Sequence, residues 1–307
     1  MTPFHPFTLV LAAVVFLLSC TPAPTAAPAD KKTIVVTYSI LGSLVKDLVG
    51  DQFTVVVPMP NGLDPHEWEP SAKDIETLNK AALIVRNGLN LEGGLEGVLA
   101  QAEKEGVPVF TAADHIAVRI VQAGQGLPSG DPDQEAGARD PHLWLDPLRL
   151  KAVVQALAAE LKTRFGTDLD ARAVALAARL DALDAEIRTL VTSLPPEDRL
   201  LVTGHESLGY LAEAYGFTLV GAIVPSLTDQ AEVSASDLAA LKKAIVDRKV
   251  GVLFTEFGTP PRVARALGSE LGLKVVEITT HALPSDGSYF TFLNALALTL
   301  VSAMLKG

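Results

Sequence analysis

The stretch LDARAVALAARLDALDAEIRTLVTSL, residues 169–194, contains neither glycine nor proline over 26 residues. These two residues disfavour a helix interior most strongly, so the run predicts one continuous helix about 39 Å long at about 1.5 Å per residue. Pro195-Pro196 ends it, and Gly166-Thr167-Asp168 separates it from an Ala- and Leu-rich segment that begins at Pro147. Such a helix can join two lobes stiffly, or it can be an ordinary amphipathic helix packed on one core.

Both flanks of this helical connection alternate short apolar runs with helical segments. In the first half we predict strands at Ile34–Tyr38, Phe53–Val57, Leu83–Arg86 and Val107–Phe110, and helices at Ser71–Lys80 and Leu91–Glu105. In the second half we predict strands at Leu200–Thr203, Phe217–Val220, Val252–Phe254 and Lys274–Ile278, and helices at Ser207–Tyr215, Ser236–Asp247, Pro261–Leu271 and Tyr289–Leu305.

This alternation is typical of parallel α/β folds. The prediction is therefore an α/β protein with two parallel-sheet lobes joined by a long rigid helix. The N-terminal lobe covers residues 33–146, the helical connection 147–196 and the C-terminal lobe 197–307. Thr291, Asn294, Thr299 and Ser302 interrupt the apolar final helix, which is also too short to span a membrane comfortably.

The N-terminus indicates export. Residues 4–18 are almost wholly apolar but shorter than the roughly 20 residues of a membrane span, which is typical of a signal peptide, here residues 1–19. Leu17-Leu18-Ser19-Cys20 looks like a bacterial lipobox, with the single cysteine, Cys20, as the lipidated residue, although no Lys or Arg precedes the apolar run. Residues 20–32, rich in proline and alanine, then form a lipid-anchored tether that can extend about 37 Å.

The net charge of the chain limits the classes of partner that it can bind. The chain of 307 residues has 25 basic and 36 acidic residues, a net charge of −11, and all of these lie at or beyond Asp30. A body this acidic is a poor partner for nucleic acid. We expect none.

Two copies of one motif place a histidine between a proline and a tryptophan: Asp64-Pro65-His66-Glu67-Trp68 and Asp140-Pro141-His142-Leu143-Trp144. Proline restricts the backbone around it and so aims the following imidazole, and histidine is the commonest protein ligand of zinc. The simpler interpretation is that both copies are turns before helices, since Pro70 and Pro147 precede helical segments. Both interpretations can hold at once.

Two further candidate ligand-binding residues lie in the second half of the chain. His205 follows a predicted strand, and ligands of parallel sheets bind at the carboxyl ends of strands. Asp286 lies in the loop after the last predicted strand, although Asp286-Gly287 is also a common turn pair. We interpret His5, His115 and His281 as structural, with His281, at a strand end, the one of them that could touch the site.

These motifs, in this order and over nearly the whole chain, resemble the zinc- and manganese-binding solute-binding lipoproteins of bacterial ABC transporters. The likeness rests on residues 61–70 (NGLDPHEWEP) and 140–147 (DPHLWLDP), and further on His205, Tyr210, residues 254–256 and residues 286–289. Departures are Glu232-Val233-Ser234-Ala235, where many relatives have Glu-Pro-Ser-Ala, and the absence of a His-rich loop before Asp140.

The resemblance implies a metal site in the cleft between the lobes. His66 and His142 would come from the first lobe and His205 and Asp286 from the second, with Glu256 beside the site orienting His205. Three imidazoles and one carboxylate favour Zn²⁺, with Mn²⁺ as the alternative cargo. The implied protein is an exported lipoprotein of the cell membrane or periplasm, a monomer without enzymatic activity, that hands the ion to an ABC permease.

Two alternatives use the same scaffold. A zinc-dependent hydrolase would normally keep three protein ligands and an open position for water, whereas four protein ligands close the site. A surface adhesin or a binder of organic solutes is equally compatible with two lobes, because fold alone does not fix function.

Overall fold

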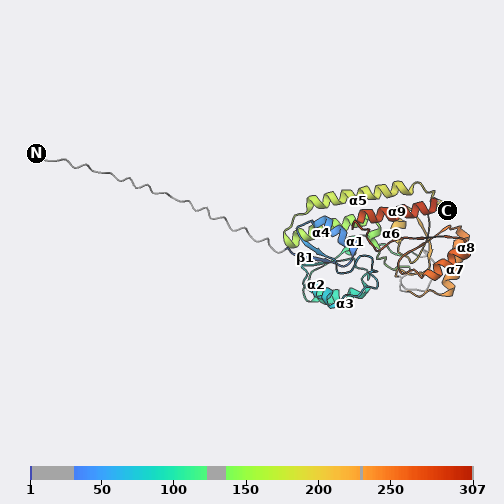
Figure 1. Cartoon of the computed structure of the whole chain (residues 1–307), viewed down its shortest axis with the longest axis horizontal. Helices are drawn as coiled ribbons and strands as arrows, with labels where there is room; N and C mark the ends of the chain where they lie inside the picture. Colours follow the sequence, from blue (N-terminus) through green and yellow to red (C-terminus); the bar gives the residue numbers. More distant parts are fainter. Residues whose placement is uncertain (2–30, 123–135, 229–230, 306–307) are drawn as a thin grey trace. The chain divides into compact units, whose positions relative to one another are not determined.

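The computed structural model describes residue 1 and residues 31–122, 136–228 and 231–305. The chain divides into two units, Met1–Asp30 and Lys31–Gly307, and the helices and strands described below lie in the second (Figure 1). The predicted signal peptide and Cys20 lie outside the described residues. Within these residues, no helix is both long enough and apolar enough to cross a membrane.

The first lobe contains a parallel four-stranded sheet of order β2-β1-β3-β4. Its strands are β1 (Thr33–Val36), β2 (Thr54–Val56), β3 (Leu83–Arg86) and β4 (Val109–Thr111). Helices α2 (Ala72–Asn79) and α3 (Glu96–Lys104) cover one face, and α1 (Ser39–Val49) contributes to the core on the other. The strand residues alternate between the two faces: Val35 packs toward α2 and α3, and its neighbours Ile34 and Val36 join the larger core.

The second lobe repeats this arrangement. Its parallel pairs are β5 (Leu200–Thr203) with β6 (Thr218–Ala222) and β7 (Val252–Thr255) with β8 (Lys274–Glu277), and β5 lies beside β7. The spatial order β6-β5-β7-β8 therefore matches that of the first sheet. Helices α7 (Ala235–Arg248) and α8 (Pro261–Leu271) share a core with one face, while α6 (Gly209–Tyr215) packs into the larger core.

A layer of long helices connects the lobes: α4 (Pro147–Phe165), α5 (Asp170–Val191) and α9 (Tyr289–Leu305) (Figure 1). Near the start of α5, Arg172 donates to the carbonyl of Leu48 in α1, and near its end Arg188 donates to the carbonyl of Ala214 in α6. These two arginines are separated by about 24 Å of helix at about 1.5 Å per residue. The predicted long helix thus contacts both lobes.

The structure departs from the predicted elements in two places. Helix α1 was not predicted, although its apolar residues recur at helical spacing, at positions 40, 41, 44, 45, 48 and 49, with Lys46 and Asp47 on the exposed side. The predicted helix Leu91–Glu105 begins instead as the 3₁₀ turn η1 (Gly93–Leu95). A Cβ at Gly94 would lie 2.4 Å from the carbonyl oxygen of Trp68, so this turn packs directly against the chain beyond the first Asp-Pro-His motif.

Candidate metal centre

The two Asp-Pro-His motifs form the same local turn. The backbone N–H of His66 donates to Asp64 Oδ1 at 2.8 Å, and that of His142 donates to Asp140 Oδ1 at 2.9 Å. In each copy a buried aspartate therefore fixes the backbone of the histidine two residues later. Both side chains are also buried, His66 at 8% exposure and His142 at 0%.

Asp140 also fixes the side chain of His142. Its Oδ1 lies 2.8 Å from His142 Nδ1, and its Oδ2 accepts from the Arg119 guanidinium at 3.0 Å in a buried ion pair. A carboxylate only accepts hydrogen bonds, so Nδ1 of His142 carries the proton and Nε2 keeps its lone pair. That lone pair is available to an ion.

His205 lies just beyond the carboxyl end of β5, where the chain passes close to the loop after β7. A Cβ at Gly204 would lie 2.0 Å from Thr259 Oγ1, so only glycine fits before this histidine. His205 Nδ1 lies 3.1 Å from Glu256 Oε1, and the His205 backbone N–H donates to the same oxygen at 3.3 Å. Glu256 is thus placed beside His205, as the resemblance implied.

Glu256 also reaches His281, which follows β8. Thr280 Oγ1 donates to Glu256 Oε2 at 2.6 Å and lies 3.0 Å from His281 Nδ1. Because the hydroxyl proton goes to the carboxylate, Oγ1 accepts from the Nδ1–H of His281. One buried carboxylate therefore favours protonation of Nδ1 in both histidines, the form in which Nε2 carries the lone pair that could bind an ion.

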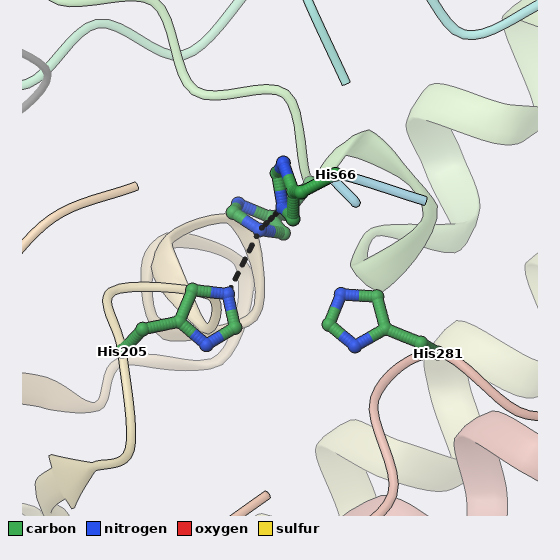
Figure 2. Close-up of side chains that lie close together, drawn as sticks. His66, His205 and His281 are labelled. Atoms are coloured by element: carbon green, nitrogen blue, oxygen red, sulfur yellow. Dashed lines mark hydrogen bonds between the residues drawn. The ribbon is translucent and has the colours of Figure 1, made fainter. Parts of the chain in front are cut away.

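The four histidines form one cluster. His66, His142, His205 and His281 are all buried and each offers a nitrogen, with all of these nitrogens within 4.8 Å of one another. The Nε2 of His142 lies 3.4 Å from that of His66 and 3.3 Å from that of His205; Figure 2 shows the rings of His66, His205 and His281 around the common centre.

These nitrogen separations fit a bound ion. Tetrahedral zinc with Zn–N bonds of about 2.0–2.1 Å places its nitrogens about 3.3–3.4 Å apart. Without an ion, the Nε2 lone pairs of His142 and His205 face each other at 3.3 Å, which is unfavourable in a buried site. The cluster is therefore arranged for a cation.

Burial favours the neutral form of His66 and His142. It lowers the pKa of His66 well below its ordinary value, and the neighbouring histidines lower it further. It also lowers the pKa of His142, against the opposing effect of Asp140. Burial alone would raise the pKa of Glu256, but the adjacent His205 and His281 and the bond from Thr280 bring it down to about 2. The site thus combines two imidazoles whose neutral form burial favours, His66 and His142, with the negative charge of Glu256.

Asp286, the predicted fourth ligand, is not brought to this cluster. Its side chain is exposed and accepts from the Ser288 backbone N–H at 3.0 Å and from the Thr291 hydroxyl at 2.7 Å, which makes it a turn residue before α9. His281, interpreted as structural, occupies the fourth position. His115 is exposed and stacks on Phe110 with 4.4 Å between ring centroids, away from the cluster, and His5 lies outside the described residues.

The signal that located His205 also applies to His281. Each histidine follows the carboxyl end of a strand, β5 or β8, which belong to two neighbouring parallel pairs of strands. The resemblance drew attention to the acidic residue five positions later. The position at a strand end, taken alone, favours His281 over Asp286 as the fourth ligand.

A pocket of about 350 Å³ opens beside the cluster. Its lining includes His66, Leu89 and Asn90 from the first lobe and Leu227 and Thr228 from the second. The cluster therefore lies at the cleft between the lobes.

Two parallel α/β lobes, a connecting helix layer and a buried histidine cluster between the lobes define a two-lobed solute-binding protein with a site for a metal ion. Comparison with known proteins gives the family: the chain belongs to the ZnuA family, described as zinc-uptake complex component A, periplasmic, whose sequence model matches residues 34–303.

Similar proteins cover most of the chain. The zinc-binding protein TroA of Treponema pallidum is 32% identical over 272 residues, covering 86% of this chain and 82% of its own. The manganese ABC transporter substrate-binding lipoprotein PsaA of Streptococcus pneumoniae is 27% identical and covers 93% of each chain. The solved structure of periplasmic zinc-binding TroA superposes with a TM-score of 0.75 at 27% identity, covering 89% of this chain and 99% of that one.

Proposed function

We propose that this protein captures a divalent transition-metal ion outside the cytoplasm, zinc in preference to manganese, and delivers it to an ABC permease for import. The observation that carries the proposal is the buried cluster of four imidazoles contributed by both lobes. Membership of the ZnuA family and the printed names of TroA and PsaA support the same role.

The ligand set in this proposal is His66, His142, His205 and His281. Four neutral nitrogen donors suit zinc, whereas manganese favours sites with carboxylate and other oxygen ligands. A site of four histidines should therefore prefer zinc over manganese more strongly than a site of three histidines and an aspartate would. Glu256, one imidazole away from the ion, supplies a buried negative charge that favours a cation.

Binding and release, rather than catalysis, fit this arrangement. A hydrolytic zinc usually keeps three protein ligands and one position for water. Four histidines fill a tetrahedral shell and leave no such position. The adhesin alternative has no observation in its favour among the described residues.

The location of the protein in the cell also belongs to this proposal. An export signal over residues 1–19, a lipid on Cys20 and a Pro/Ala-rich tether would hold the metal-binding body near the permease. We expect Cys20→Ala to release the protein from membranes without changing zinc affinity. Persistence of this variant in the membrane fraction would show that Cys20 is not the anchor.

The central experiment is metal analysis of the protein purified without added metal, followed by competition between zinc and manganese. We expect one ion per chain and tighter binding of zinc. Equal or tighter manganese binding would overturn the preference, and the absence of stoichiometric binding would overturn the function. Metal-dependent turnover of a test ester would favour the hydrolase alternative instead.

A further inference from the structure

The segment that carries His281 runs from the end of β8 to the start of α9, residues 278–288. It follows a strand of the second lobe, yet side chains of the first lobe bind its backbone. Trp144 Nε1 donates to the carbonyl of Thr280 at 2.9 Å, and Ser43 Oγ donates to that of Gly287 at 2.8 Å. Between these points, Asn61 makes a paired contact.

The amide of Asn61 binds both backbone groups of Leu283. Asn61 Nδ2 donates to the Leu283 carbonyl at 2.8 Å, and the Leu283 N–H donates to Asn61 Oδ1, also at 2.8 Å. Asn61 lies five residues before His66, and Leu283 lies two residues after His281. This contact, the Asn61–Leu283 clasp, therefore ties together the loops that carry two of the four histidines.

Beyond the clasp, the two loops are partly separated by an open space. A pocket of about 450 Å³ lies between them, lined by Val57, Met59 and Pro60 on one side and Pro284, Ser285 and Gly287 on the other. Because the space is open, the hydrogen bonds at its borders determine where the 278–288 segment lies.

The other supports of the cluster are more deeply buried. The turns of His66 and His142 are each fixed by an aspartate of their own motif, at 3% and 0% exposure, and His205 by Glu256. The ring of His281 also has a buried partner, Thr280, but the backbone two residues beyond it is held by the clasp. The clasp is exposed. An ion enclosed by four buried imidazoles leaves only when a ligand moves away, and the 278–288 segment is the ligand-bearing part with the most solvent-exposed attachment.

We propose that Asn61 is a positioning residue that holds the imidazole of His281 in the site, so that opening of the Asn61–Leu283 clasp controls how fast the ion is released. This inference rests on the proposed function, because it takes the histidine cluster to be the metal site. It assigns to an exposed amide, distant in sequence from His281, control of the lifetime of the bound ion.

The test measures zinc dissociation from the full chain after rapid mixing with excess chelator. Asn61→Ala removes both bonds to Leu283, and we expect the dissociation rate to rise roughly three- to tenfold. Asn294→Ala is the matched control, since it makes the same change at an exposed asparagine of α9 that bonds Glu186. This control should release zinc at the wild-type rate.

A double-mutant cycle separates positioning from general structural weakening. If Asn61 acts through His281, Asn61→Ala should change the dissociation rate less than twofold in a His281→Ala background. A wild-type rate in Asn61→Ala, or the same fold-change in both backgrounds, would overturn the inference. Failure of the wild-type chain to bind zinc would instead overturn the proposed function.

Discussion

The two lobes support their histidines in different ways. In the first lobe each histidine has its own aspartate two residues earlier, Asp64 for His66 and Asp140 for His142. In the second lobe a single carboxylate, Glu256, serves both, bonding His205 directly and His281 through Thr280. The first arrangement is local in sequence. The second links three separate strand ends.

This difference determines how damage spreads. Loss of a local aspartate affects one histidine, whereas loss of Glu256 removes a support of two, His205 and His281. Hydrogen-bond partners of metal-binding histidines commonly contribute tenfold or more to affinity. The second lobe is therefore the more vulnerable half of the site, and each of the following tests compares the two halves.

Lowering the pH should have the largest effect on zinc affinity, because protons compete with zinc for every imidazole of the cluster. Burial lowers the pKa of His66 and His142, so protons should compete with zinc at these two ligands only as pH falls below about 6.5, the usual imidazole pKa, and zinc affinity should drop steeply there. The limiting slope should approach about four protons per ion if all four histidines bind, or about three without His281. Zinc competition titrations between about pH 4.5 and 7.5 measure it.

The same shifts predict the stability of the metal-free protein. Below about pH 6.5 the unfolded chain protonates His66 and His142 while the folded chain does not, so the unfolded state binds more protons. The free energy of unfolding should fall as pH decreases through this window, and level off once the folded imidazoles take up protons. A constant unfolding midpoint from pH 7 to 5 would contradict the lowered pKa values.

Within the first lobe, His142→Ala should lower zinc affinity more than His66→Ala does. The Nε2 of His142 contacts those of both His66 and His205, and its removal leaves Asp140 without the imidazole. We expect affinity to fall at least tenfold for His66→Ala, about 1.4 kcal/mol, and about a hundredfold or more for His142→Ala. Isothermal competition titration measures both, with His115→Ala as a control outside the cluster. Wild-type affinity in either variant would mean that the repeated motif has been misinterpreted.

Removing the shared carboxylate tests the comparison directly. Glu256→Gln keeps the size of the side chain but removes its charge and one acceptor, so we expect zinc affinity to fall about 10- to 100-fold. Asp140→Asn, which disturbs one histidine, should cost less. Glu186→Gln, the same change on the surface of α5, should leave affinity unchanged. If Asp140→Asn proves the more damaging variant, the shared support in the second lobe is not the critical one.

The contrast between the lobes also explains what the sequence could reveal. His66 and His142 were identifiable because each motif contains its own support within five residues. The two lobes and α5 followed from periodicity and from the lack of glycine and proline. His281 was interpreted as structural because the resemblance pointed to Asp286 instead, although His281 also follows a predicted strand. Its partners Thr280 and Glu256 come together with it only on folding. Helix α1 was overlooked even though its apolar residues do recur at helical spacing.

The choice of fourth ligand is the finest test, and it sets His281 against Asp286. His281→Ala should weaken zinc binding about tenfold, because one of four nitrogens is lost, whereas Asp286→Asn should have no effect, because its exposed carboxylate only caps the turn before α9. His281→Asp would replace an imidazole with a carboxylate and should bring the zinc and manganese affinities closer together by roughly tenfold, since manganese favours oxygen ligands. Competition titrations of all three variants decide the matter. A loss of affinity in Asp286→Asn with none in His281→Ala would restore the aspartate as the ligand and would mean that the loop before α9 rearranges around the ion.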